Sequence, residues 1–140
     1  MATNPLQIKG IDHVVLRVSD AERAIAFYCD ALGCKTERHV EEIGLIQLRA
    51  GNSLVDLVTL DGKLGQAGGD APDPSRKNMD HFAITLSQFD ADAIKAHLAR
   101  HGIECGEPAE RYGAEGYGPS IYLRDPDGNT VELKGPPGSD

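Results

Sequence analysis

The sequence has little positive charge and no long apolar run, and each shortage excludes a class of protein. Its 140 residues include 14 Lys and Arg against 22 Asp and Glu, giving a formal net charge of −8. Binding to nucleic acid or to an anionic membrane surface depends on clustered Lys and Arg, so we expect neither. No apolar run approaches the ~20 residues of a membrane span, so we expect no membrane association.

Cysteine is also scarce. The three cysteines, Cys29, Cys34 and Cys105, are odd in number and form no Cys-x-x-Cys pair. This usage is typical of reduced thiols in an intracellular protein. The N-terminal residues show neither the positive nor the apolar region of a secretion signal. We therefore expect a cytoplasmic protein.

What the sequence does contain is a repeat. Residues 11–18 read Ile-Asp-His-Val-Val-Leu-Arg-Val, and residues 79–86 read Met-Asp-His-Phe-Ala-Ile-Thr-Leu. Each run has the pattern of a strand with an Asp-His pair at its front end. Each is followed by a helix-like stretch and later by a strand with a carboxylate, Asp56 or Glu132.

The first copy predicts the element order β-α-β-β-β. A capping box, with Ser19 as N-cap and Glu22 three positions on, begins a helix that runs to about Leu32. Gly33 then ends the helix. Three strands are expected to follow, at 36–40, 45–49 and 54–60.

The second copy predicts the same order after a linker. Residues 61–78 are rich in Gly and Pro and are expected to be flexible. A strand at 79–86 and a helix capped by Ser87 or Asp90 come next. Short strands are expected at 103–105, 120–124 and 130–134.

These patterns predict an α+β fold in a single domain, 1–140. It contains two βαβββ modules, 10–60 and 79–134, joined by the linker 61–78. The modules are expected to pair into a curved, partly closed mixed sheet around a metal cavity. A chain of this length needs no disulfide or structural metal to fold.

Two histidines and two carboxylates hold equivalent places in the two copies. His13 and His81 open the first strands, and Asp56 and Glu132 lie on the last ones. Both carboxylates are flanked by Val and Leu, and a buried unpaired charge is costly. If all four side chains reach one cavity, they suit a divalent metal such as Zn, Ni, Mn, Fe(II) or Co. His39, His97 and His101 lack such a partner pattern.

Four motifs together resemble the vicinal oxygen chelate superfamily, which includes glyoxalase I, extradiol dioxygenases, fosfomycin-resistance enzymes and bleomycin-resistance proteins. The motifs are Asp-His-Val-Val-Leu-Arg-Val (12–18), Ala-Phe-Tyr-Cys-Asp-Ala-Leu-Gly (26–33), Asp-His-Phe-Ala-Ile (80–84) and Asp-Pro-Asp-Gly-Asn-Thr-Val-Glu-Leu (125–133). The resemblance implies that His13, His81 and Glu132 are metal ligands. The fourth position, a Glu in glyoxalase I, falls on Asp56, which is one methylene shorter. Direct binding, binding through water and a three-ligand site all stay open.

The resemblance also points to substrate contacts. Arg17 falls where glyoxalase-type members carry an Arg that holds the glutathione conjugate, and strand alternation places it on the face of His13. An Asn that helps bind glutathione in some members is Leu60 here, so the use of glutathione stays open. The Gly-rich stretch 111–120 is expected to be a mobile rim that offers Arg111, Tyr112 and Tyr117 to an anionic substrate, or else a plain surface loop.

The resulting hypothesis is a metal-dependent, glyoxalase-like lyase or isomerase for a small substrate with vicinal oxygens. The metal would act as a Lewis acid, and Glu132 would move a proton. An Fe(II) extradiol-type dioxygenase is an alternative, although the second cavity base common in that group is not evident. Thiol transfer to an epoxide antibiotic and drug binding of the bleomycin-resistance type are others, and the full ligand set counts against the last.

We also expect a homodimer. The linker is long enough for the modules to be exchanged between chains. Each site would then take His13 and Asp56 from one chain and His81 and Glu132 from the other.

Overall fold

The structure is a computed structural model that describes residues 4–138. No helix in this range is long and apolar enough to cross a membrane. In chain order the elements are β1 (His13–Val18), α1 (Ala21–Ile25), the π-helical η1 (Ala26–Ala31), β2 (Lys35–Val40), the 3₁₀ turn η2 (Glu41–Ile43), β3 (Leu45–Ala50), β4 (Ser53–Thr59), α2 (Lys63–Gln66), β5 (Phe82–Thr85), α3 (Ala91–Arg100), β6 (Ala109–Gly113), β7 (Gly116–Arg124) and β8 (Thr130–Lys134).

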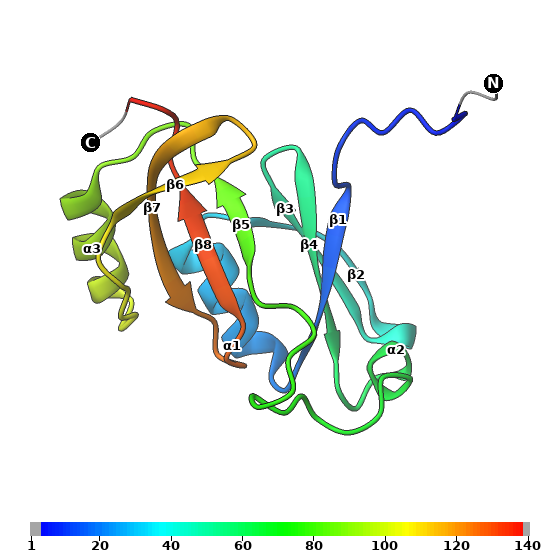
Figure 1. Cartoon of the computed structure of the whole chain (residues 1–140). Helices are drawn as coiled ribbons and strands as arrows, with labels where there is room; N and C mark the ends of the chain where they lie inside the picture. The colour runs from blue at the N-terminus through cyan, green and yellow to red at the C-terminus, as the bar shows by residue number, and fades with distance from the viewer. Residues whose placement is uncertain (1–3, 139–140) are drawn as a thin grey trace.

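The strands form two separate sheets, one from each half of the chain (Figure 1). Their orders are β1-β4-β3-β2 and β5-β8-β7-β6. In each sheet the first strand pairs in parallel with the last strand of its half, and the other pairs are antiparallel. The predicted α+β fold of two βαβββ modules is confirmed, and the two sheets do not close on each other within the chain.

The helix of the first half packs against the second half, behind β5 and β8 in Figure 1. Phe27 and Tyr28 belong to the same buried cluster as Leu123 and Val131. The fully buried Tyr28 donates its hydroxyl hydrogen bond to Asp125 Oδ2 over 2.7 Å. Burial and, next, the negative charge of Asp125 raise the pKa of Tyr28 strongly. The two halves therefore share one core, although their sheets are separate.

The start of this helix differs from the prediction. Asp20, not Ser19, is the N-cap, because its side chain accepts from the backbone N–H of Arg23. The backbone N–H of Ser19 donates instead to Asp127 Oδ1 over 3.0 Å, in the turn before β8. A contact between the two halves therefore takes the place of the predicted capping box.

The predicted loop 111–120 is wrong, because these residues lie in a β-hairpin made by β6 and β7. Tyr112 and Tyr117 pair across it, with ring centroids 5.0 Å apart, and aromatic pairs of this kind stabilise a hairpin. Gly116 takes a φ of 96° just after the turn, which a larger residue adopts only with strain. The predicted strand 103–105 is reduced to a single bridge between Cys105 and Leu123.

The linker 61–78 is partly ordered by the first sheet. It contains the short helix α2, and the guanidinium of Arg17 donates to the backbone carbonyls of Gly65, Gly69 and Asp70. Gly68 lies so close to Arg17 that an added Cβ would stand 2.4 Å from Nε. Residues 65–70 of the linker are therefore held to β1.

Candidate functional site

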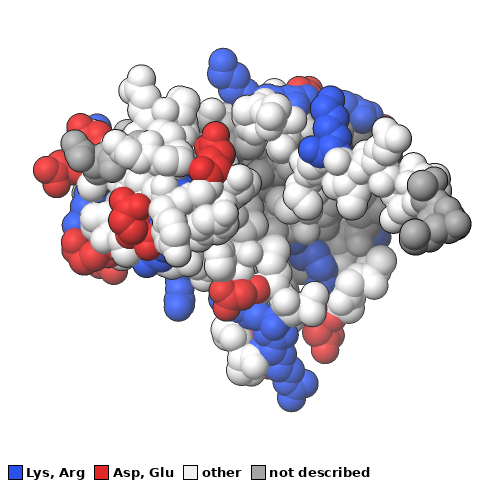
Figure 2. Space-filling view, turned by 45° about the horizontal axis from the view of Figure 1, so that its top comes forward, with Lys and Arg blue, Asp and Glu red and all other residues white. Residues whose placement is uncertain are grey.

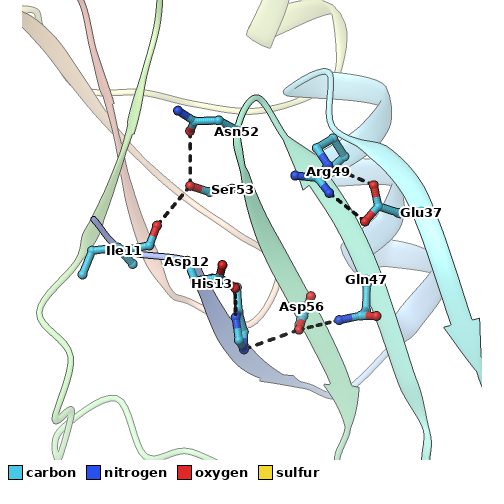
Figure 3. Close-up of polar contacts among 9 residues, drawn as sticks. All are labelled: Ile11, Asp12, His13, Glu37, Gln47, Arg49, Asn52, Ser53 and Asp56. Atoms are coloured by element: carbon cyan, nitrogen blue, oxygen red, sulfur yellow. Dashed lines mark hydrogen bonds and ion pairs between the residues drawn. The ribbon is translucent and has the colours of Figure 1, made fainter. Parts of the chain in front are cut away.

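The first half brings His13 and Asp56 together on one face of its sheet (Figure 3). His13 Nδ1 contacts Asp12 Oδ2 at 2.7 Å, and its Nε2 faces Asp56 Oδ2 at 3.9 Å. The Asp56 side chain is 4% exposed, whereas that of His13 is 43% exposed. The hydrogen bond that the His13 ring donates to Asp12 is the main cause of the raised pKa of His13.

The second half repeats this arrangement more tightly. His81 Nδ1 contacts Asp80 Oδ2 at 2.6 Å, and its Nε2 faces Glu132 Oε1 at 3.1 Å. The side chains of His81 and Glu132 are 31% and 8% exposed. His81 lies immediately before β5, whereas the predicted strand, 79–86, included it.

In both halves the aspartate before the histidine fixes which ring nitrogen is free. Because Asp12 and Asp80 accept from Nδ1, the neutral rings carry their lone pair on Nε2. That lone pair faces a carboxylate oxygen, and two acceptors in contact require a cation between them or a proton on the ring. An imidazole oriented by a carboxylate on its other nitrogen is also the usual setting of a histidine metal ligand. The donor chemistry of each pair therefore fits a divalent metal.

The two pairs do not form one cluster within the chain. Among residues 4–138, no group of three or more His, Cys, Asp or Glu side chains has a metal-binding arrangement. A cleft of about 630 Å³ separates the edge strands β1 and β5, and it includes His13 but none of the other three candidate ligands. A larger groove of about 1130 Å³ between η1, residues 101–106 and β7 contains none of the four.

Beside Glu132, the second sheet carries Tyr122 and Arg111. Tyr122 pairs with Glu132 in register, and its ring meets that of His81 edge-on at 5.2 Å. Partial burial and, next, the charge of Glu132 raise the pKa of Tyr122. Arg111 lies over the Tyr122 ring at 4.3 Å and donates through Nη1 to the hydroxyl and carbonyl oxygens of Ser120. Tyr122, which could have faced either way, thus lies at the site.

The other predicted substrate residues lie elsewhere. Alternation along the hairpin puts Tyr112 and Tyr117 on the face opposite to Arg111, and their exposed fractions are 74% and 67%. Arg17 is on the face of His13, but each of its guanidinium nitrogens already donates to a carbonyl of the linker. Of the predicted substrate residues, Arg111 is the one that contacts Tyr122, the neighbour of Glu132.

Sequence reasoning missed Gln47 and Arg38. Gln47 Nε2 donates to Asp56 Oδ2 over 3.1 Å, and Arg38 Nη1 donates to Gln47 Oε1 over 3.1 Å. The alternation of β3 could have found Gln47, because polar Gln47 and Arg49 alternate with buried Ile46 and Leu48. No such signal existed for Arg38, since a bulge between Thr36 and Arg38 shifts the register of β2.

The charge on the surface is uneven. In Figure 2 the acidic side chains are mostly on the left of the view, and basic side chains border and line a hollow in its right half. The first sheet carries Arg17, Arg38 and Arg49 on the face of Asp56, where Arg49 forms a bidentate pair with Glu37 at 2.8 and 2.9 Å. This face is therefore richer in arginine than the acidic chain as a whole.

Comparison with known proteins gives a family match along nearly the whole chain. A model described as Glyoxalase/Bleomycin resistance protein/Dioxygenase superfamily matches residues 10–133. The chain is 31% identical over 135 residues to the glyoxalase domain-containing protein RDO1 of Mycosarcoma maydis, covering 91% of this chain and 69% of that protein. It is 30% identical over 128 residues to catechol-2,3-dioxygenase of Bacillus subtilis, covering 88% of this chain but only 40% of that enzyme.

A third relative has a solved structure. Virulence protein STM3117 of Salmonella typhimurium is 32% identical over 127 residues, covering 90% of this chain and 83% of that protein. Its crystal structure matches with a TM-score of 0.71 and 28% identity, covering 94% of this chain and 99% of the other. The fold of this chain is therefore shared with a relative along almost its entire length.

Proposed function

Because the chain belongs to the glyoxalase/bleomycin resistance protein/dioxygenase superfamily, we propose that it is a metal-dependent glyoxalase-like enzyme, a lyase or isomerase. Its substrate is a small molecule with vicinal oxygens. The observation that carries the proposal is the repeated placement of a histidine Nε2 opposite a carboxylate oxygen, at 3.9 Å in the first half and 3.1 Å in the second. A family fold alone does not require this placement, and a divalent metal bound by both atoms would account for it in both halves.

His13, Asp56, His81 and Glu132 are the proposed ligands, and the ion is Ni, Zn, Mn or Fe. When bound, the ion supplies Lewis-acid stabilisation of the negative charge that develops on a substrate oxygen. Neither half supplies more than two of these ligands. The two halves must therefore meet to complete a site.

We infer that they meet across a homodimer, in which His13 and Asp56 of one chain face His81 and Glu132 of the other. The separation of the two pairs within one chain supports this assembly. So does Val15, which pairs in register with Asp56 and is 51% exposed, an unusual position for a large apolar side chain next to a buried carboxylate. Sedimentation at micromolar concentration tests the assembly, and a species of only 15.0 kDa would contradict it.

The remaining residues orient substrate and move a proton. Glu132 is proposed to accept and return a substrate proton when it is not fully committed to the metal. Arg111 keeps its Nε and Nη2 hydrogens without a partner among the described residues, so it can donate to an anionic group of the substrate. Arg17 would reach substrate only after releasing the linker, and Tyr112 and Tyr117 only from the rim of a partner chain.

Metal analysis of protein purified without added metal tests the proposal. We expect about one divalent ion per site in the wild type, and loss of the ion in His81→Ala. His39→Ala is the matched control, because His39 lies on the opposite face of β2 from the Gln47 side chain. A metal-free wild type that still binds small ligands would support a drug-binding protein instead.

The second candidate is an Fe(II) extradiol-type dioxygenase, which is favoured by the likeness to the Bacillus subtilis enzyme. The same ligands would serve Fe(II), and the open positions would take a catechol and O₂. Iron in the purified protein, together with oxygen consumption on addition of catechol, would favour this activity. Nickel or zinc without oxygen consumption would favour the glyoxalase-like one.

The cytoplasmic location is also a proposal. All three cysteines are free in the structure, which agrees with a reducing compartment. Fractionation of cells that express the full chain tests it.

A further inference from the structure

The two carboxylate oxygens of Asp56 have different surroundings (Figure 3). Oδ2 accepts a hydrogen bond from Gln47 Nε2 over 3.1 Å and lies 3.9 Å from His13 Nε2. Oδ1 is buried and has no hydrogen-bond partner among the described residues. An unpaired buried oxygen is costly, and no described residue offsets this cost at Oδ1. The contact with Gln47 is what holds Oδ2 on the side of His13.

Arg38 fixes the orientation of the Gln47 amide. Its Nη1 donates to Gln47 Oε1 over 3.1 Å, so the NH₂ group of Gln47 must point the other way, toward Asp56. Arg38 reaches this face because of the bulge in β2, which sets Arg38 opposite Gln47. Bulges that redirect one side chain are frequent beside functional sites.

The second half contains a corresponding row of side chains. Glu132 pairs in register with Tyr122, and Arg111 lies over the Tyr122 ring. In each sheet the carboxylate therefore has a polar neighbour on the next strand, Gln47 or Tyr122, and an Arg behind that neighbour. The identities differ while the order is kept, which indicates that the support of the carboxylate, and not one residue type, is what the two halves share.

We propose that Gln47, oriented by Arg38, is a positioning residue that keeps Asp56 Oδ2 facing His13 Nε2 as a metal ligand. This inference rests on the proposed metal-dependent function. Without the amide, the Asp56 carboxylate is free to rotate and must be ordered at the moment of binding, which weakens the affinity.

The test measures the affinity of the full-length protein for Zn²⁺ and Ni²⁺ by competition with a chromophoric chelator. Gln47→Met keeps the length of the side chain and removes the amide, and we expect a ~10- to 100-fold loss of affinity. Arg38→Met leaves the amide in place but free to flip, so its loss is smaller, about two- to fivefold.

Arg49→Met is the matched control. Arg49 lies two residues from Gln47 on the same face of β3, but it pairs with Glu37 and not with Asp56. We expect its affinity to stay within twofold of the wild type. Thermal unfolding and sedimentation of each variant separate a loss of affinity from a loss of fold or assembly. If Gln47→Met does not fold, Gln47→Leu replaces it.

The outcomes distinguish this inference from the proposed function. A folded Gln47→Met that binds metal as tightly as the wild type overturns the role of Gln47 and leaves the metal site standing. An equal loss in Arg49→Met also overturns it, because the effect then belongs to the whole sheet face. A wild type that binds neither metal overturns the proposed function, and this inference with it.

Discussion

Each half of the chain contains a histidine–carboxylate pair, and the distance between the two side chains differs between the halves. The distance from the histidine Nε2 to the carboxylate is 3.9 Å in the first half and 3.1 Å in the second. The first half uses the shorter Asp56 and the more exposed histidine, and the second uses Glu132. The second half is therefore the better formed part of the proposed site. The first half depends more on its support, Gln47 and Arg38.

The largest expected effect comes from removing each carboxylate in turn. Glu132→Ala should weaken Zn²⁺ binding by more than ~100-fold, because even residues that only support a ligand typically contribute ~10- to 100-fold. Asp56→Ala should cost less than Glu132→Ala but no less than Gln47→Met, about 100-fold, since its oxygen stands farther from its histidine than that of Glu132. Chelator competition measures both. Equal losses would mean that the shorter Asp56 contributes as much to binding as Glu132.

The second prediction concerns a substitution that weakens the contact between the halves. Tyr28→Phe removes the buried hydroxyl that donates to Asp125, and we expect a loss of ~1.5–3 kcal/mol in the free energy of unfolding. Urea unfolding measures it. Tyr117→Phe is the control, because Tyr117 is exposed and should change stability by less than about 0.5 kcal/mol.

The same variant has a pH signature. The folded pKa of Tyr28 is raised, so below the unfolded value of about 10 the phenol is neutral in both states. Above that pH the unfolded chain ionises and the folded one does not, so wild-type stability falls as pH rises. Tyr28→Phe should therefore lose less stability than the wild type between about pH 9 and pH 11. Parallel curves would contradict the raised pKa.

The third prediction concerns a feature that only the first half has, the linker fixed by Arg17. Gly68→Ala places a methyl group 2.4 Å from Arg17 Nε, so the guanidinium must leave its carbonyl partners. We expect a loss of ~1–2 kcal/mol and faster proteolysis within residues 63–70. Gly10→Ala, whose Cβ meets nothing within 4 Å, should change neither.

The smallest expected effect comes from removing the charge of Asp12 while keeping the shape of its side chain. The raised pKa of His13 means that its proton is kept to a higher pH, and a protonated ring cannot bind metal. Asp12→Asn should lower this pKa toward 6.5, measured by NMR titration of the ring. Asp92→Asn, on α3, is the control. An unchanged His13 titration in Asp12→Asn would show that Asp12 is not the cause.

Much of the fold could be read from local patterns. The repeated Asp-His strand starts and the order β-α-β-β-β appear in the structure as two sheets of the same topology. The strands over residues 109–119 were missed, because Gly-rich sequence is also typical of loops and the pairing of Tyr112 with Tyr117 is a cross-strand contact. The N-cap was misplaced for a similar reason, since Ser19 is engaged by Asp127 from the other half.

The sequence alone determined which residues could hold a metal, because the repeat of histidine and carboxylate positions is a property of the linear order. Alternation along each strand also determined that His13 and Arg17 share a face. Tertiary structure decided which of these residues come together and which are already held by other partners. It tied Arg17 to the linker, turned Arg38 toward Gln47 through a bulge, and kept the two histidine–carboxylate pairs apart within one chain. These outcomes depend on contacts between residues distant in sequence, which no local pattern encodes.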